Sequence, residues 1–418
     1  MSSTVGKVLQ RQHDIVLYGA TGFVGKLTAA HLARHAPDGV HIALAGRSTS
    51  RVEAVRDGLP AAARDWPIVV ADSSDEASLR ALAESSKVVI STVGPYARYG
   101  LPLVGACATA GTDYVDLTGE VLFVRESIDR FAAEAERTGA RIVHSCGFDS
   151  VPSDLGALVL SRAVERDEAG ELGDTTLYMA MKGGVSGGTI ASAMNQLDEV
   201  RGDSAKRKLA GDKFALSPDR GAEPSGEWRD SAAVRYSPEI GAWTAPFVMA
   251  TYNTRIVRRS NALLGHAYGR SFRYREVQRA GSGWRGRLAA YAVAGALAAG
   301  FGAMALPFLR PVVRRVLPSP GEGPSEQTQQ SGHFRATLCT TTSTGASYRS
   351  TVAAQGDPGY AATAVMLGES ALCLAVSRDD CPLPDGLSGG VLTPATALGE
   401  VLVARLRAKD FLIEAGRA

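Results

Sequence analysis

A glycine-rich turn near the start of the chain has the residue types and the spacing that bind a dinucleotide. Its three glycines stand three positions apart, between a short β-branched segment and a segment rich in Ala and Leu. Where such a turn joins a strand to a helix, backbone N–H groups can approach a pyrophosphate, and the helix N-terminus adds partial positive charge. The alternative is a tight turn that binds nothing. We predict that a dinucleotide contacts Gly19, Thr21, Gly22, Phe23, Val24 and Gly25.

The end of the second predicted strand indicates which dinucleotide binds. NAD enzymes usually carry an Asp or Glu about 20 residues beyond the glycines, where it holds the ribose 2′-hydroxyl. Here Arg47 follows Gly46 and no acid is present. Because a guanidinium matches phosphate geometry, this position favours NADP, with an ordinary exposed Arg as the alternative. Asp72 ends the third predicted strand and is expected either near the adenine or in a turn or helix cap.

The loop after the fourth predicted strand is a second candidate for cofactor contact. Ligands of open parallel sheets bind at the carboxyl ends of the strands, where the strand order reverses. We therefore predict that this loop runs beside the nicotinamide ribose, although a Gly-Pro pair alone is an ordinary turn. Its four predicted contact residues are Thr92, Val93, Gly94 and Pro95.

Strand-like and helix-like segments alternate through the first 150 residues. The strand-like segments are residues 14–19, 41–47, 67–75, 87–95 and 140–147. Strands that alternate with helices of this length form βαβ units and a parallel sheet. The sequence therefore predicts an α/β fold with a Rossmann doubly wound parallel sheet in residues 1–155.

After residue 155 the regular alternation of strand-like and helix-like segments ends, and the new pattern predicts a second, mixed α/β domain. Residues 175–183, 245–253 and 334–355 have the pattern of antiparallel strands, and residues 188–204 have that of a helix. An amphipathic helix is expected over 393–410. We predict an inserted substrate or catalytic α+β domain over 156–388 and a C-terminal segment, 389–418, whose helix returns to the Rossmann domain.

The overall composition excludes some classes of function. The 418 residues carry a net charge of +2, and 45% of them are hydrophobic. The hydrophobic fraction suffices for a large core, and the near-neutral charge gives no reason to expect nucleic-acid binding. His, Cys, Asp and Glu nowhere cluster at the spacing of metal ligands, so we predict no metal site.

Six motifs resemble those of a known family. They are YGATGFVG at 18–25, STVGPYARYG at 91–100, YVDLTGE at 114–120, CGFDSVPSDLG at 146–156, GGVSGGTIAS at 183–192 and GGVLTPATALGE at 389–400. In this order they resemble the saccharopine dehydrogenase-like oxidoreductases, and among these most closely the mycobacterial trans-acting enoyl reductases that serve phthiocerol and related lipid assembly. The resemblance implies an NADP-binding Rossmann domain, an inserted domain with substrate contacts, and a C-terminal helix that packs on the first domain.

The saccharopine dehydrogenase-like family does not by itself fix a reaction. Saccharopine dehydrogenases proper reduce an imine that joins two amino acids, whereas the motif loops here are Gly, Ser and apolar and a long apolar segment is inserted, which favours a lipid substrate. We therefore predict NADPH-dependent reduction, in trans, of a double bond in a protein-bound lipid or polyketide chain of the phthiocerol dimycocerosate or phenolic glycolipid type, as in the trans-acting enoyl reductases that the sequence resembles. The alternatives are an imine-reducing, saccharopine dehydrogenase-like amino-acid oxidoreductase and a non-catalytic, membrane-associated NADP-binding protein. An apolar lining of the second domain would favour the enoyl reductase, an Arg cluster would favour the amino-acid oxidoreductase, and an occluded interior would favour the non-catalytic protein.

Enoyl reduction needs a proton donor near the substrate, and two residues are the main candidates. Tyr96 follows the predicted nicotinamide-side loop, and its alternative is a packing aromatic. Asp149 precedes a predicted helix, and its alternative is a helix cap, as for Asp154. Tyr178 and Lys182 have the spacing of a short-chain dehydrogenase pair, but on a predicted strand they lie too far apart to act together. The other donors considered are Tyr99, Asp116, Glu120, His144 and Cys146.

An uncharged segment over 288–309 is long enough to span a bilayer as a helix. Arginines flank both of its ends, and a span would separate the C-terminal helix from the Rossmann domain. We therefore expect peripheral membrane contact through 288–315, or a cap over an apolar substrate tunnel, with a buried inter-domain helix as the alternative. The expected location is the cytoplasm, in part on the inner face of the cell membrane.

Overall fold

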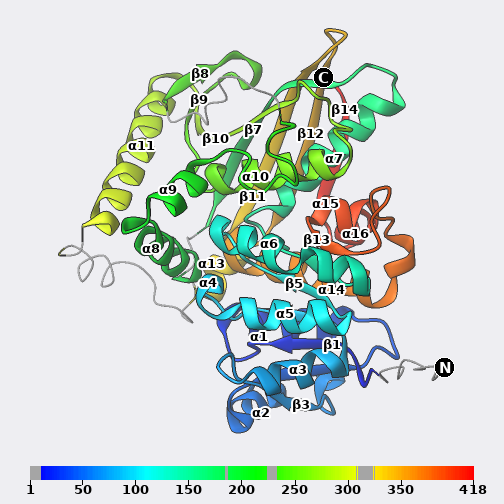
Figure 1. The fold of residues 1–418 in the computed structure, drawn as a ribbon. Coiled ribbons are helices and arrows are strands. Elements are labelled where there is room, and N and C mark those ends of the chain that lie inside the picture. The colour runs from blue at the N-terminus through cyan, green and yellow to red at the C-terminus, as the bar shows by residue number, and fades with distance from the viewer. Residues whose placement is uncertain (1–10, 184–186, 224–232, 307, 309–322, 324) are drawn as a thin grey trace.

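The computed structural model describes residues 11–183, 187–223, 233–306, 308, 323 and 325–418. These residues form two units, each built around a sheet of seven strands (Figure 1). The first sheet and its helices contain most of the N-terminal third of the chain. The second sheet lies on the other side of a shared layer of helices.

The first sheet is parallel throughout, in the order β13-β6-β5-β4-β1-β2-β3. The chain order reverses between β1 and β4, which places the topological switch point beside the glycine-rich turn. This confirms the predicted Rossmann doubly wound sheet. Its strands are β1 (His13–Tyr18), β2 (Ile42–Gly46), β3 (Ile68–Val70), β4 (Ser86–Ser91), β5 (Asp113–Asp116), β6 (Arg141–Val143) and β13 (Gly390–Leu392).

Helices cover this sheet because its central strands are apolar on both faces. Ile15, Val16 and Leu17 of β1 are fully buried, a burial pattern typical of a central parallel strand. The helices of this unit are α1 (Phe23–His35), α2 (Thr49–Asp57), α3 (Glu76–Ser85), α4 (Tyr96–Tyr99), α5 (Leu101–Ala110) and α6 (Val121–Thr138).

The second sheet is mixed, in the order β14-β12-β11-β7-β10-β9-β8. Strands β7 and β10 pair in parallel, whereas the other neighbours pair antiparallel. This confirms a second, mixed α/β unit. Its strands are β7 (Leu172–Lys182), β8 (Arg235–Ser237), β9 (Ala242–Pro246), β10 (Arg273–Gly281), β11 (His333–Thr342), β12 (Ser347–Gln355) and β14 (Leu412–Arg417).

One sequence-predicted strand of this unit is wrong. Residues 245–253 end β9 and then begin α10 (Ala250–Leu263), which packs on β10 and on α7 (Val151–Arg166). The apolar run Phe247–Ala250 has no periodicity that separates a strand from a buried helix start. The remaining helices of this part are α8 (Gly187–Arg201), α9 (Ser204–Gly211) and α13 (Glu326–Ser331).

Late segments of the chain return to the first sheet. Helix α14 (Thr363–Val376) packs against β1, β4 and β5, and β13 pairs with β6. The single helix expected over 393–410 is wrong: α15 (Pro394–Ala397) and α16 (Gly399–Arg407) replace it, and α16 begins at Gly399, which has a left-handed backbone conformation. The last strand, β14, then joins the second sheet.

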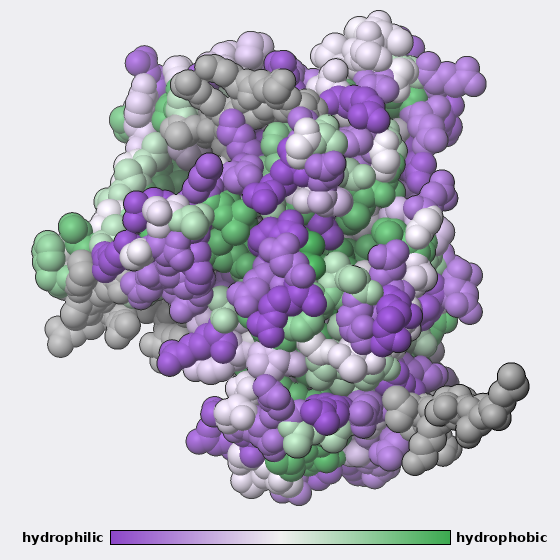
Figure 2. Space-filling view, in the orientation of Figure 1, coloured by the Kyte–Doolittle hydropathy of each residue, from purple (hydrophilic) through white to green (hydrophobic). Residues whose placement is uncertain are grey.

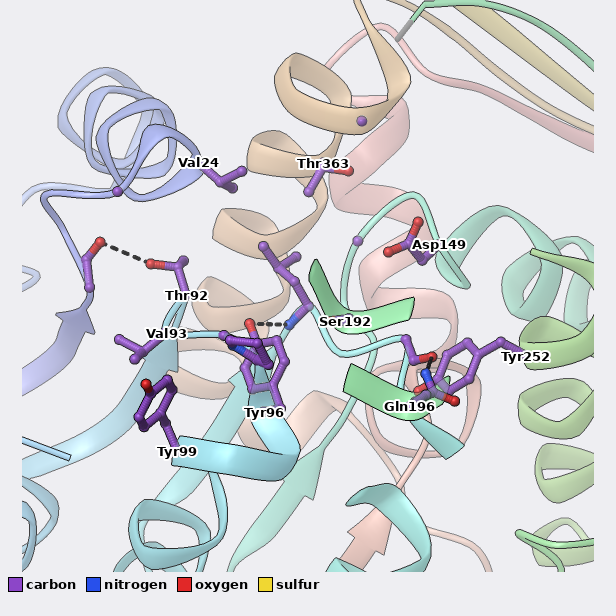
Figure 3. Close-up of a pocket in the computed structure, with 18 of the residues that line it drawn as sticks. Val24, Thr92, Val93, Tyr96, Tyr99, Asp149, Ser192, Gln196, Tyr252 and Thr363 are labelled. Carbon is purple, nitrogen blue, oxygen red and sulfur yellow. Dashed lines mark hydrogen bonds between the residues drawn. The ribbon is translucent and has the colours of Figure 1, made fainter. Parts of the chain in front are cut away.

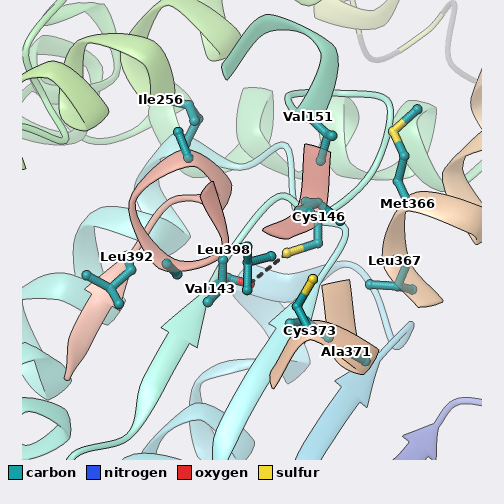
Figure 4. Packing of buried hydrophobic residues seen from close by; sticks show 14 of the residues in the cluster. Val143, Cys146, Val151, Ile256, Met366, Leu367, Ala371, Cys373, Leu392 and Leu398 are labelled. Atoms are coloured by element: carbon teal, nitrogen blue, oxygen red, sulfur yellow. Dashed lines mark hydrogen bonds between the residues drawn. The ribbon is translucent and has the colours of Figure 1, made fainter. Parts of the chain in front are cut away.

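One hydrophobic core continues from the first sheet into the layer of helices. Figure 4 shows Val143 of β6 and Leu392 of β13 beside Ile256 of α10 and Leu367 of α14. All four side chains are at most 2% exposed. Because segments distant in sequence share this core, the two units are held together by apolar packing.

Helix α11 (Gly283–Ala305) lies at the edge of the second unit, against β9 and β10. It is long and apolar enough to cross a membrane, yet only 11% of its most apolar window is buried. The alternative of a buried inter-domain helix is therefore wrong. Figure 2 shows its apolar side chains in pale green at the left edge of the molecule. A second apolar helix, Pro358–Val376, is 72% buried and belongs to the core.

Candidate functional site

The glycine-rich turn has a geometry that only glycine allows. Gly19 has φ +91°, and a Cβ there would lie 2.5 Å from Thr92 Oγ1. A Cβ on Gly25 would lie 2.3 Å from the Gly19 carbonyl oxygen, so α1 could not pack so closely on the strand end. No side chain caps the start of α1, so no side chain competes for the first N–H groups of the helix, which lack intrahelical partners. The arrangement is that of a phosphate cradle.

Arg47 stands at the end of β2, exposed and at the rim of the same cavity. Ser73, which follows β3, also lines the cavity, whereas the sequence-predicted Asp72 does not. The Asp72 carboxylate accepts hydrogen bonds from the backbone N–H and the hydroxyl of Ser74, at 2.9 and 2.7 Å. These bonds lower the pKa of Asp72 and place it in a turn, which was the alternative weighed from the sequence.

The loop after β4 runs along the opposite side of the glycine turn. Thr92 Oγ1 donates to the Gly19 carbonyl oxygen at 3.0 Å and thereby ties the ends of β1 and β4 together. Figure 3 shows Thr92 and Val93 close to Val24 of α1, on one side of the cavity. Gly94 and Pro95, joined by a cis peptide bond, also line the cavity.

A cavity of about 680 Å³ connects this cofactor-binding side to the second unit. Every sequence-predicted contact residue except Asp72 lines it. Its far wall comes from the loop before α7 and from helices α8, α9, α10 and α11. The residues of that far wall include Asp149, Ser192, Gln196, Leu197, Val200, Ala210, Val248, Met249, Thr251, Tyr252, Arg255 and Phe301.

Tyr96 lines the cavity, but its hydroxyl is not directed at a substrate. The side chain is only 5% exposed; its hydroxyl donates to the Ser91 carbonyl oxygen at 3.0 Å and accepts from the Leu117 N–H at 3.2 Å. The single hydroxyl proton is therefore committed to the backbone. The geometry favours the packing alternative and does not support Tyr96 as the proton donor.

Asp149 lies in the cavity wall, half-buried, and its carboxyl group makes no hydrogen bond to another described residue. Burial raises the pKa of Asp149 to about 6. The capping alternative does not hold, because the N-cap of α7 is Ser150 and no side chain caps that helix. Asp154, by contrast, accepts from the Ala395 N–H at 2.7 Å and is fully buried.

The other donors considered from the sequence have structural partners. The Glu120 carboxylate accepts from the N–H groups of Tyr96 and Ala97, at 2.9 and 2.8 Å, and so caps the short helix α4. Cys146 is fully buried, and burial raises the pKa of its thiol. Tyr178 and Lys182 lie on strand β7, and neither lines the cavity. Tyr99 does line it.

Comparison with known proteins relates the whole chain to one family. A family model described as the saccharopine dehydrogenase NADP binding domain matches residues 15–143. A putative trans-acting enoyl reductase of Mycobacterium tuberculosis is 52% identical over 97% of this chain and 98% of its own. The trans-acting enoyl reductase of Mycobacterium ulcerans is 47% identical over 98% of this chain and 99% of its own.

The chain belongs to the trans-acting enoyl reductase family. This confirms the resemblance inferred from the six motifs. The fold is also similar to that of apo saccharopine dehydrogenase (L-Glu forming) from Saccharomyces cerevisiae, with a TM-score of 0.55 and 11% identity, over 97% of this chain and 99% of that one. At that identity the similarity concerns the fold alone.

The cofactor-binding side fits NADP. The three glycines leave open the space that their Cβ atoms would fill, and the uncapped start of α1 offers N–H groups to a pyrophosphate. Arg47, at the end of β2, would hold the 2′-phosphate, and the loop after β4 would lie beside the nicotinamide. These residues agree with the NADP-binding description of the matching family model.

The sequence did not reveal the residues that the second unit contributes to the cavity wall. Ser192 and Gln196 stand one turn apart on α8; Ser192 Oγ donates to Glu120 at 2.6 Å, and Gln196 Nε2 donates to the Gly119 carbonyl oxygen at 3.1 Å. The motif GGVSGGTIAS ends on Ser192 and was the available signal. Tyr252 had no such signal, because its segment was predicted as a strand.

Proposed function

We propose that the protein uses NADPH to reduce the carbon–carbon double bond of an enoyl thioester on a lipid or polyketide chain. Two features support the proposal: a cavity that joins the cofactor-binding side to a substrate side, and the carboxyl group of Asp149 in its wall, which has no hydrogen-bond partner among the described residues. The names of the relatives, which are 47% and 52% identical, agree with it.

The apolar side chains in the far wall of the cavity are the observation that carries this proposal. A long acyl chain needs apolar walls, because it gains about 0.8 kcal/mol for each CH₂ removed from water. The side chains of α8, α11 and the segment before α10 offer such walls. They are Leu197, Val200, Val248, Met249 and Phe301.

The same wall offers little to a substrate with several carboxylates. Among the described residues of the far wall, Arg255 is the basic one. Its guanidinium donates to the carbonyl oxygens of Asp212, at 3.0 Å, and Ala210, at 2.9 Å. An Arg bound to backbone in this way is poorly placed to pair with a carboxylate, so the wall disfavours an imine of two amino acids.

The chain's own groups have separate tasks in the proposed reaction. NADPH, when bound, supplies the hydride that adds to the β-carbon. The Asp149 carboxyl group, with its raised pKa, gives a proton to the α-carbon. An acyl chain that fills the cavity would displace water from it, so the charge that develops on the substrate would meet protein donors in a medium of low dielectric constant.

We also propose how the substrate reaches the protein. A trans-acting enzyme receives its chain from a separate synthase, so the enoyl group arrives bound to a carrier protein. Helix α11 and the segment after it, 288–315, make peripheral contact with the inner face of the cell membrane, and the protein is otherwise cytoplasmic. The exposed apolar side chains of α11, together with five arginines and no acidic residue between 283 and 321, support this contact.

The proposed reaction is tested with a long-chain 2-enoyl pantetheine thioester and NADPH deuterated at the transferred position. We expect loss of NADPH absorbance and a saturated product that carries deuterium at the β-carbon, as seen by mass spectrometry. The comparison substrate is the imine of an aldehyde with glutamate. Reduction of the imine but not of the thioester would favour the amino-acid oxidoreductase. NADPH binding without turnover of either would favour the non-catalytic alternative.

A further inference from the structure

A buried tyrosine hydroxyl stands in the cavity wall opposite the cofactor-binding turn. Tyr252, on α10, lines the cavity and is 3% exposed. Figure 3 shows it on the same side as Asp149 and Gln196, across from Val24. Its hydroxyl is hydrogen-bonded to Ser145 Oγ, on the loop after β6. The hydroxyl therefore sits where a helix of the second unit meets the first sheet.

The partner of this hydroxyl is held in a costly backbone conformation. Ser145 has φ +66°, a region that costs a non-glycine residue roughly 1–3 kcal/mol and persists only where the surroundings enforce it. Asp116 Oδ1 accepts the Ser145 N–H at 3.0 Å, and the Thr118 carbonyl oxygen accepts the Ser145 hydroxyl proton at 3.0 Å. Both bonds aim Ser145 Oγ at Tyr252.

A second layer fixes Asp116 in turn. Its other oxygen, Oδ2, lies 2.7 Å from His144 Nδ1, and His144 Nε2 lies 2.8 Å from Ser127 Oγ. Asp116, His144 and Ser127 are each at most 1% exposed. A fully paired buried network of this kind keeps its members rigid. Asp116 and His144, both weighed from the sequence as donors, thus support a tyrosine that the sequence did not reveal.

The proton positions show what Tyr252 can do. Ser145 has one hydroxyl proton and donates it to Thr118, so Tyr252 donates to Ser145 Oγ in the ligand-free state. If a carbonyl oxygen enters the cavity, the Tyr252 O–H can turn to it while Ser145 donates to Tyr252 instead. Only two hydrogens rotate. Burial raises the pKa of Tyr252 well above its ordinary value, so the hydroxyl keeps its proton.

We propose that Tyr252 is the hydrogen-bond donor for the thioester carbonyl oxygen, and that Ser145 positions it. The inference rests on the proposed function. As the new C–H bond forms at the β-carbon, the π electrons of the double bond move toward the carbonyl oxygen, where Tyr252 stabilises the negative charge. Asp149 then protonates the α-carbon, and the C=O bond is restored. Tyr252 keeps its proton throughout, so Asp149 remains the acid.

The kinetic test compares matched tyrosine variants of the full chain with the enoyl thioester and NADPH. Tyr252→Phe is expected to lower kcat about 100-fold or more with a small change in KM, because removing one such donor costs about 10²–10³ in kcat. Ser145→Gly, which suits the left-handed backbone, is expected to lose about tenfold. Tyr178→Phe is the control, since that buried hydroxyl bonds Ser237 Oγ at 2.7 Å outside the cavity.

An infrared measurement separates this role from a structural one. A ¹³C-carbonyl enoyl thioester is bound with NADP⁺, which cannot reduce it, and the carbonyl band is recorded by difference spectroscopy. We expect a band lowered by the Tyr252 hydrogen bond in the wild type and in Tyr178→Phe, and a higher band in Tyr252→Phe. If Tyr252→Phe does not fold, Ser145→Gly is used instead. Its carbonyl band is expected to shift part of the way up.

Two failures are distinguishable. A wild type that reduces the thioester, with kcat and band position unchanged in Tyr252→Phe, would overturn the role of Tyr252 and leave the proposed function standing. A wild type that binds NADPH but does not reduce the thioester would overturn both.

Discussion

At the scale of single residues, Asp149 sets the expected pH dependence. Burial raises its pKa to about 6, so the acid form that donates a proton is lost as the pH rises through this value. We expect kcat/KM for the enoyl thioester to fall above about pH 6. Asp149→Asn cannot donate and should reduce the rate by about 10²–10⁴, with this limb of the profile gone. A retained limb in Asp149→Asn would assign the acid to another group.

Arg47 sets the expected choice between the two nicotinamide cofactors. Removing one hydrogen bond to a charged group costs about 1.5–3 kcal/mol. Arg47→Ala should therefore weaken NADPH binding tenfold or more and leave NADH binding nearly unchanged, as measured by fluorescence titration. The control is Arg130→Ala, which removes an exposed Arg of α6 that does not line the cavity. Equal losses for both cofactors would contradict contact with the 2′-phosphate.

At the scale of elements, the approach of α1 to β1 depends on the absence of a side chain at Gly25. A Cβ there would lie 2.3 Å from a backbone oxygen, which no side-chain rotation can relieve. We expect Gly25→Ala to lower the unfolding temperature and to abolish NADPH binding. Gly58→Ala is the matched control, because its Cβ would have its nearest neighbour at 3.5 Å. NADPH affinity of the wild-type level in Gly25→Ala would contradict this account.

Helix α11 is the element expected to touch a membrane. Leu288 is 66% exposed and Tyr291 54% exposed, beside Arg285 and Arg287. The protein should float with anionic phosphatidylglycerol vesicles, less so with phosphatidylcholine, and be stripped off by carbonate. The double variant Leu288→Glu/Tyr291→Glu should lose flotation.

Val70→Glu, which changes an exposed apolar residue on β3, is the control for this membrane test. Flotation that survives in the double variant would exclude α11 as the contact. Resistance to carbonate would indicate a true membrane span instead of peripheral contact.

At the scale of the whole molecule, neither unit is a continuous piece of chain. The first sheet needs α14 on one face and β13 at its edge, both from the last quarter of the sequence. Glu369 of α14 further bonds His31 of α1 and Arg405 of α16, each at 2.8 Å, while fully buried itself. The predicted boundary at residue 155 falls inside helix α7, which packs on the second sheet.

This interleaving predicts that residues 1–155 do not fold alone. Without α14 the fragment exposes a face of its sheet, and that apolar area is no longer removed from water. We expect a fragment without a cooperative thermal transition or near-ultraviolet circular dichroism, whereas the fragment linked to residues 356–418 should regain both. A cooperative transition in residues 1–155 alone would show that the boundary marks an independent domain.

The sequence by itself determined the Rossmann sheet and its nucleotide-binding turn. Glycine spacing, apolar strand segments and the Arg after β2 are local properties of the sequence, and each acts within one βαβ unit. The exposed apolar helix was also visible, because a long uncharged segment needs no tertiary partner to be recognised. Whether such a segment is buried or exposed depends on what packs against it, and only the tertiary structure showed that α11 lies on the surface.

Only the tertiary structure decided which side chains face the substrate. Tyr96 was the better-placed donor in the sequence, but the fold commits its hydroxyl to two backbone groups and leaves the Asp149 carboxyl half-buried, with no hydrogen bond to another described residue. Tyr252 and Ser145 stand 107 positions apart, so no local pattern could join them. The direction of a hydroxyl and the pKa of a carboxyl depend on neighbours that distant segments supply.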